Sequence, residues 1–142
     1  MQVFIIGTPL ATAMALDRKR LNKQIIECQQ ILDALNGAKA WSNHPCVLQY
    51  CGYEKWLEHY LSCLTLYKNN AGIHAKVCSD LAQMSKPEWH TTEYFDQMKR
   101  RLFEKDDEHY KQWSHLGKSD INWYWSPSEG KFIKYRNGKK IE

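Results

Sequence analysis

The sequence predicts an all-α fold, as one compact domain of residues 1–142 with a short extended N-terminus and an irregular, aromatic and basic C-terminal arm. Three observations predict it. The length is that of a single domain that can bury its own core. Apolar residues recur at three- and four-residue steps, as they do from Tyr53 to Leu64. Helix-capping residues punctuate the periodic segments, and no repeat or linker divides the chain.

The N-terminal elements are marked by their own start and stop signals. Residues 2–6 (QVFII) are apolar and read as an extended stretch. Thr8 followed by Pro9 is the pattern of an N-cap and a first helical residue, and it begins a short helix that runs to about residue 16. A longer helix is expected over about 17–35, because Asn36-Gly37 is a typical helix end.

The middle of the chain predicts three further helices. Residues 38–47 form a loop, and a long helix is expected over 47–70, with a bend at Gly52. Another helix covers about 72–84. Thr91 or Thr92 then caps a helix that runs to about residue 105, and a turn or two follows within 105–114.

The segment from residue 121 to the end is aromatic, basic and rich in turn signals, with Ser126-Pro127 and Asn137-Gly138 as two turns. Trp123, Tyr124 and Trp125 are interleaved with lysines, which is typical of a surface that contacts nucleic acid. The pattern equally fits an arm that packs its aromatic rings on the helices while the lysines remain solvated. Both readings stay open.

Composition restricts the function classes. The net charge of +4 suits a polyanionic partner without requiring one, and 6 Trp and 8 Tyr are many for this length. The five cysteines include no Cys-x-x-Cys pair and are expected to be reduced thiols in the cytoplasm. The alternative is a zinc site of His44, Cys46 and Cys51, although their spacing suits zinc poorly. The apolar N-terminus lacks the positive charges of a signal peptide, and no segment is long enough to span a membrane.

The helix over 17–35 mixes opposite charges at the edge of its apolar stripe. Asp17, Arg20, Gln24 and Glu27 fall within an arc of roughly 80° on a helical wheel. They are either surface ion pairs of small energy, Arg20 with Asp17 and Lys23 with Glu27, or one wall of a site in which carboxylates stabilise a cation. Spacing alone favours the ion pairs. Asn43 and His44, on the loop before the next helix, are further candidates, because such loops commonly carry function.

Several segments together resemble one family. LDRKRLNKQIIECQQIL, WSNHPCV followed by GYEKWLEHY, LFEKDDEHY and the closing NWYWSP and GKFIKY are similar, in order and spacing, to the small pyrimidine-dimer DNA glycosylases of the phage-type endonuclease V family, above all its bacterial branch. The resemblance covers nearly the whole chain. It implies a compact helical fold, no cofactor and no metal, and two activities in DNA repair: cleavage of an N-glycosidic bond at a damaged or modified base, and strand scission by β-elimination.

The same resemblance implies that the nucleophile is the α-amino group of the first residue, which attacks the sugar C1′ and forms an imine with the help of a glutamate. Met1 would supply the amine, and the bulk of Gln2 favours retention of Met1. An α-amine has a pKa of about 7.7–8.0 against about 10.4 for lysine, so more of it is the free base at neutral pH. Amines are also the nucleophiles that form Schiff bases.

Matching KRLNK to the family motif puts Arg20 at the position of the glutamate, so we expect Glu27, with Asp17 second, to act as the carboxylate. Met98 with Lys99, and Asp107, are further departures from the bacterial pattern. The residues expected to contact DNA are Gln2, Arg18, Arg20, Lys23, Gln24, Asn43, His44, Lys99, Trp123, Tyr124, Trp125 and Lys131. The expected partner is double-stranded DNA, bound by a monomer in the cytoplasm, or in the host-cell cytoplasm if the protein is viral.

Two other functions remain open. Arg20 at the carboxylate position is compatible with a nucleic-acid-binding protein that keeps the fold and has lost catalysis. A helical interaction module that uses its Trp and Tyr surface would lack affinity for DNA altogether.

Overall fold

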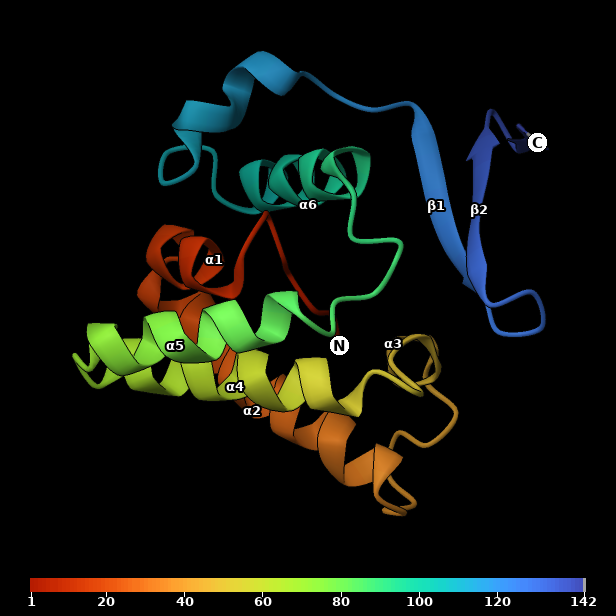
Figure 1. Ribbon diagram of the computed structural model, residues 1–142. Helices are drawn as coiled ribbons and strands as arrows, with labels where there is room; N and C mark the ends of the chain where they lie inside the picture. The colour runs from red at the N-terminus through yellow and green to blue at the C-terminus, as the bar shows by residue number, and fades with distance from the viewer. Residues whose placement is uncertain (142) are drawn as a thin grey trace.

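The computed structural model describes residues 1–141 and consists of a helical body followed by a small antiparallel sheet (Figure 1). The elements are, in chain order, α1 (Pro9–Ala15), α2 (Arg18–Leu35), α3 (Pro45–Gln49), α4 (Glu54–Lys68), α5 (Gly72–Gln83), α6 (Thr92–Lys105), the 3-10 helix η1 (Lys111–Leu116), β1 (Ile121–Ser126), β2 (Lys131–Arg136) and β3 (Lys139–Lys140). The fold is therefore mostly helical, as expected, but it is not all-α.

Capping residues set the helix ends where the sequence indicated. Thr8 accepts a hydrogen bond from the backbone N–H of Ala11 at 3.1 Å and begins α1. Thr91 does the same for Tyr94 at 3.3 Å and begins α6. The helices expected over 17–35 and 72–84 are confirmed to within about a residue at each end.

The prediction of a single long helix over 47–70 is wrong, because this region folds as two helices. His44 caps α3, and its Nδ1 accepts the N–H of Cys46 at 3.1 Å, so the first helix begins earlier than expected. This helix ends at Gln49, and the connection to α4 passes through Gly52, whose φ is +91°. This conformation is open to glycine and strained for other residues, so α4 starts only after it.

The prediction of an irregular C-terminal arm is also wrong, because the arm forms a β-hairpin. β1 and β2 pair antiparallel, with Trp123 opposite Lys134 and Trp125 opposite Phe132. Asn137 and Gly138, both at positive φ, then make the two-residue turn into β3. In INWYWS, Ile121, Trp123 and Trp125 alternate with Asn122, Tyr124 and Ser126, and this period of two is the strand signal that the sequence carried.

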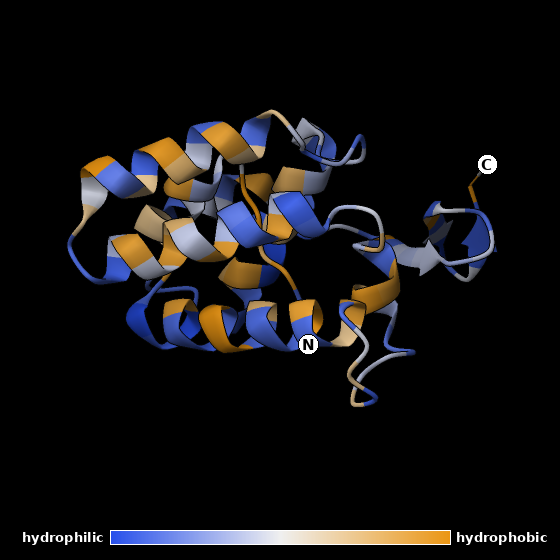
Figure 2. Ribbon diagram, turned by 60° about the horizontal axis from the view of Figure 1, so that its bottom comes forward, coloured by the Kyte–Doolittle hydropathy of each residue, from blue (hydrophilic) through white to orange (hydrophobic). Residues whose placement is uncertain are grey.

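The N-terminal segment runs through the middle of the molecule, between α6 on one side and α2, α4 and α5 on the other (Figure 1). Val3 and Ile5 are buried in the main hydrophobic cluster, together with side chains from most of the helices. Figure 2 shows this segment as a largely apolar coil that leads to the N-terminus. None of the described helices combines the length and apolar character needed to cross a bilayer.

Candidate active site

Two cavities meet at Met1 and Gln2, which line both of them. The aromatic cavity, of about 210 Å³, is also lined by side chains of α3, α6 and the hairpin, including Gln49, Tyr94, Gln97, Arg101, Trp123, Tyr124, Trp125 and Phe132. The basic cavity, of about 250 Å³, is also lined by Phe4, Lys19, Arg20, Lys23, Gln24, Glu27 and Lys105. The first two residues of the chain thus form the partition between an aromatic and a cationic surface.

Gln24 fixes the position of this partition. Its amide is buried, accepts the backbone N–H of Phe4 at 2.6 Å and donates to the backbone oxygen of Gln2 at 2.8 Å. The hydroxyl of Tyr60 donates to the backbone oxygen of Phe4 from the other side. Because its amide is occupied by these bonds, Gln24 holds the N-terminal segment against α2 and does not offer its amide to a ligand.

Glu27 lies beside the start of the chain. Its Oε2 accepts the backbone N–H of Gln2 at 3.0 Å, so the carboxylate is one residue away from the Met1 amine. Lys23 reaches the other carboxylate oxygen at 3.8 Å and is itself largely exposed. The ion pair expected from spacing therefore forms, and the same carboxylate also faces the basic cavity at the N-terminus.

Asp17 belongs to a different cluster and lines neither cavity. It stands at the N-cap position of α2 without a side-chain capping bond, pairs with Arg20 at 3.2 Å and accepts a hydrogen bond from the hydroxyl of Tyr110. Burial alone would raise the pKa of Asp17, but the bonds from Tyr110 and Arg20 outweigh it and hold the pKa below its usual value. Of the two candidate carboxylates, only Glu27 is placed near the Met1 amine.

Cys46 forms part of the wall of the aromatic cavity next to the N-terminus. Burial raises the pKa of its thiol to about 12, while the Val3 N–H and the charge of the Met1 amine lower it and Glu27 raises it. The amine, the thiol and the carboxylate thus lie within electrostatic reach of one another. With this pKa, Cys46 remains a thiol at neutral pH and does not compete with the amine as a nucleophile.

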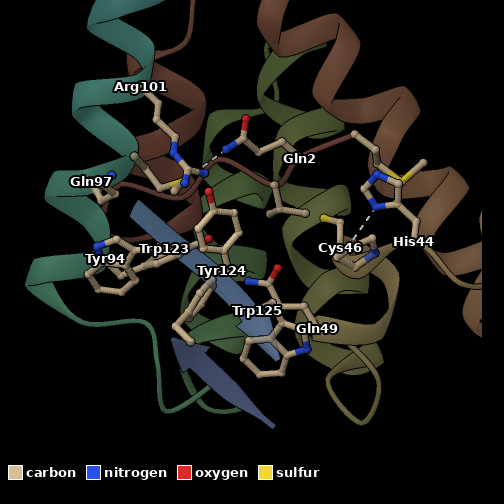
Figure 3. A pocket seen from close by; sticks show the side chains of 15 residues that line it. Gln2, His44, Cys46, Gln49, Tyr94, Gln97, Arg101, Trp123, Tyr124 and Trp125 are labelled. Atoms are coloured by element: carbon tan, nitrogen blue, oxygen red, sulfur yellow. Dashed lines mark hydrogen bonds between the residues drawn. The ribbon is translucent and has the colours of Figure 1, made fainter. Parts of the chain in front are cut away.

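One face of α6 and both strands of the hairpin form the opposite wall of the aromatic cavity. Tyr94, Gln97 and Arg101 come from successive turns of α6, and Arg101 extends toward Gln2 (Figure 3). The Nε2 of Gln2 approaches the sulfur of Met98 at 4.0 Å, which ties the N-terminus to the same helix. Aromatic rings beside amide and guanidinium groups can stack on a nucleobase and bond to its edge.

The loop before α3 contributes His44 to this cavity, and Asn43 lies next to it in an exposed position. Because the Nδ1 of His44 accepts the Cys46 N–H, a neutral His44 carries its proton on Nε2 and acts there as a donor.

The basic cavity gathers four cations around Glu27. Lys19, Arg20 and Lys23 come from the first turns of α2, and Lys105 comes from the end of α6. Arg20 is partly engaged, since it pairs with Asp17 and approaches Asp106 at 3.9 Å. Lys19 and Lys105 are exposed and make no ion pair within residues 1–141, so they remain available to phosphate oxygens.

The structure brings most of the expected site residues together and leaves others apart. The residues that meet at the two cavities are Met1, Gln2, Arg20, Lys23, Gln24, Glu27, His44, Trp123, Tyr124 and Trp125. Arg18, Asn43 and Lys131 are exposed and line neither cavity. Lys99 points to another part of α6, where it pairs with Asp96 at 3.7 Å and lies 6.0 Å from the ring of Trp113.

Sequence reasoning missed the residues that α6 contributes. Tyr94, Gln97, Arg101 and Lys105 recur at three- and four-residue steps and therefore share a face. The spacing predicts that these four residues share a face, but it does not indicate which face of α6 approaches the N-terminus. Among residues 1–141 no three His, Cys, Asp or Glu side chains are grouped to hold a metal, and His44, Cys46 and Cys51 form no such group. All five cysteines are free thiols.

Comparison with known proteins agrees with this geometry. Residues 1–66 match the family described as pyrimidine dimer DNA glycosylase. No curated protein and no solved structure matches the chain. The matched segment contains the N-terminus, the carboxylates of α2 and the His44 loop, whereas α6 and the hairpin lie outside it. The similarity to the pyrimidine dimer DNA glycosylase family therefore extends over residues 1–66, a little less than half of the chain.

Proposed function

We propose that the protein is a DNA glycosylase with AP-lyase activity, which excises a damaged or modified pyrimidine base from double-stranded DNA through the amine of Met1. The observation that carries the proposal is the placement of that N-terminus. Met1 lies where an aromatic and a cationic cavity meet, and the carboxylate of Glu27 bonds the next backbone N–H at 3.0 Å. The family match over residues 1–66 supports a glycosylase.

The reaction needs a free amine and a nearby carboxylate. The amine attacks C1′, the bond from C1′ to the base breaks, and the base leaves with a proton. The amine nitrogen gives up one of its two protons, the sugar ring opens as O4′ takes up a proton, and a protonated imine forms between Met1 and C1′. Removal of a C2′ proton then expels the 3′ phosphate by β-elimination, and water hydrolyses the imine to regenerate the amine. Glu27 stabilises the cationic imine and accepts protons in these steps.

The two cavities have complementary tasks in this proposal. The cations of the basic cavity hold phosphates on either side of the target nucleotide. The aromatic cavity takes a base that has left the stack, because its rings offer stacking surfaces and Gln49, Gln97 and Arg101 offer polar atoms. Its volume of about 210 Å³ lies below the range of about 300–1,000 Å³ typical of drug-sized ligands, which favours a single base.

Borohydride trapping tests the covalent step. The full chain is mixed with duplexes that contain an abasic site or a pyrimidine dimer, and reduction converts any imine into a stable amine link between protein and DNA. We expect a trapped complex whose DNA-linked peptide begins at Met1. A chain with an acetylated N-terminus should give no trapped complex and no cleavage. Equal cleavage by the acetylated chain would show that the amine is not the nucleophile.

A second candidate is a DNA-binding protein of the same fold without catalysis. The feature that favours it is Arg20 at the position where the family motif has its glutamate, paired with Asp17. This candidate predicts salt-dependent binding to duplex DNA, with no trapping and no cleavage of any damaged duplex.

A further inference from the structure

Helix α5 exposes a stripe of large apolar side chains. Ile73 is 82% exposed, Val77 54%, Leu81 42% and Met84, which caps the helix, 83%. Elsewhere among the described residues, exposed apolar side chains of this size occur as separate positions, such as Met14 on α1 and Ile26 on α2. Single exposed apolar residues are ordinary, but four in a row along one helix mark a surface that is covered by something.

The stripe lies opposite the face that α5 buries. Ala75, Ser79 and Ala82 are buried where α5 packs on α4 and α1. At 100° per residue the four apolar side chains fall within an arc of roughly 80° centred on the opposite side. Figure 2 shows apolar residues recurring along α5 at the outside of the helical body. No residue of α5 lines the aromatic or the basic cavity, so the stripe is separate from the proposed active site.

We propose that this stripe is covered by the same stripe of a second copy of the chain, with the two α5 helices antiparallel about a twofold axis. The spacing is self-complementary. An axis between residues 78 and 79 sets Ile73 opposite Met84 of the second copy, and it sets Val77 within one residue of the position opposite its Leu81. A twofold interface requires this reciprocity, because the same patch must fit itself.

Charge supports the antiparallel arrangement. Lys76 and Asp80 lie on one flank of the stripe and pair with each other at 3.1 Å. In an antiparallel pair of helices the same flank of each helix meets, so Lys76 of one copy faces Asp80 of the other, twice. In a parallel pair this flank would instead meet the flank that carries His74. The antiparallel arrangement is thus complementary in both its apolar and its charged residues.

The stripe is one helix wide and four apolar side chains long, so the proposed interface is a small one. Specific interfaces bury about 1,000 Å² or more in total, and smaller contacts are weak or transient. We therefore expect an equilibrium between monomer and dimer that depends on protein concentration, and not an obligate dimer.

Sedimentation velocity of the full chain over a wide range of concentrations tests the proposal. We expect the sedimentation coefficient to rise from the monomer to the dimer value. Val77→Glu puts a carboxylate from each copy into the apolar contact and should raise the dissociation constant by about tenfold or more. The matched control is Ile26→Glu on α2, where the native side chain is 59% exposed and lies outside the stripe. It should leave the dissociation constant unchanged.

Charge reversal tests the orientation. Lys76→Glu places like charges opposite each other and should weaken the dimer, and adding Asp80→Lys to the same chain should restore it, because opposite charges face each other again. Failure of the double variant to restore the dimer would show that the antiparallel arrangement is wrong. A wild-type chain that stays monomeric at every concentration, or equal effects of Val77→Glu and Ile26→Glu, would overturn the proposal and leave the stripe to a different protein.

Discussion

Two carboxylates of the same helix differ in what surrounds them. Glu27 bonds the backbone of Gln2 and faces the basic cavity, whereas Asp17 is tied to Tyr110 and Arg20 away from both cavities. A helical wheel places both on one arc, so the sequence alone could not separate them. Their separation comes from Tyr110, which lies 93 residues along the chain from Asp17.

Glu27→Gln should lower kcat for strand cleavage by about 10²–10⁴-fold while DNA binding changes little, because the amide keeps the shape and loses the charge and the proton-accepting oxygen. Single-turnover kinetics on an abasic duplex measure this. Asp17→Asn is the matched control: it should lower the free energy of unfolding through its lost contacts and leave the cleavage rate within a few-fold. The reverse pattern would make Asp17 the assisting carboxylate.

His90 makes stability depend on pH. It is buried, and its Nε2 and the Tyr50 hydroxyl lie 3.3 Å apart; burial first, and then the charge of Lys86, lower its pKa from 6.5 to about 3. The unfolded chain takes up a proton below about pH 6.5 and the folded chain does not. The free energy of unfolding should therefore fall as the pH drops from 6.5 toward 3, by up to about 1.4 kcal/mol per pH unit.

Urea unfolding at a series of pH values measures this dependence. His90→Gln, which keeps a polar group near the Tyr50 hydroxyl, should flatten it. His74→Gln, at an exposed position of α5, should not. An unchanged slope in the His90 variant would contradict the prediction.

At the scale of elements, α6 presents different cations on different faces. Arg101 lines the aromatic cavity, and Lys99, two residues earlier, pairs with Asp96 elsewhere on the helix. Arg101→Gln should weaken binding to a duplex with a damaged base by about tenfold, because it removes a charge beside the N-terminus. Lys99→Gln should change it less than threefold by fluorescence anisotropy. Equal losses of affinity in the two variants would show that Lys99 also contacts DNA, as the sequence predicted.

The sequence predicted the elements with strong local signals and missed those that depend on distant contacts. The ends of α1, α2 and α6 follow from capping residues such as Thr8 and Thr91, which act on their own turn. The sequence predicted a bend at Gly52, whereas the structure has a break between two helices there. A glycine permits either a bend or a break, and the packing of the flanking helices determines which one forms. The aromatic cavity needs α3, α6 and β1 to meet at Gln2, and no local pattern encodes that meeting.

For the whole molecule, the proposed DNA contact is electrostatic and should be sensitive to salt. Lys105 is exposed, lines the basic cavity and makes no ion pair among the described residues. Lys105→Gln should weaken binding to all duplexes alike and make the slope of log K against log salt shallower by about 0.9, the value for one phosphate contact. Lys111→Gln, outside both cavities, should leave the slope unchanged.

The anchoring of the N-terminal segment has a consequence for biosynthesis. Its bonds come from Gln24, Tyr60 and Met98, so the segment has no complete binding site until those residues have left the ribosome. Until then the first residues emerge as free chain, open to the enzymes that trim or acylate nascent N-termini. Afterwards Val3, Phe4 and Ile5 are buried by the fold, and Met1 and Gln2 are partly exposed at the two cavities. Acylation of Met1 at that stage would remove the proposed nucleophile before the protein that uses it has folded.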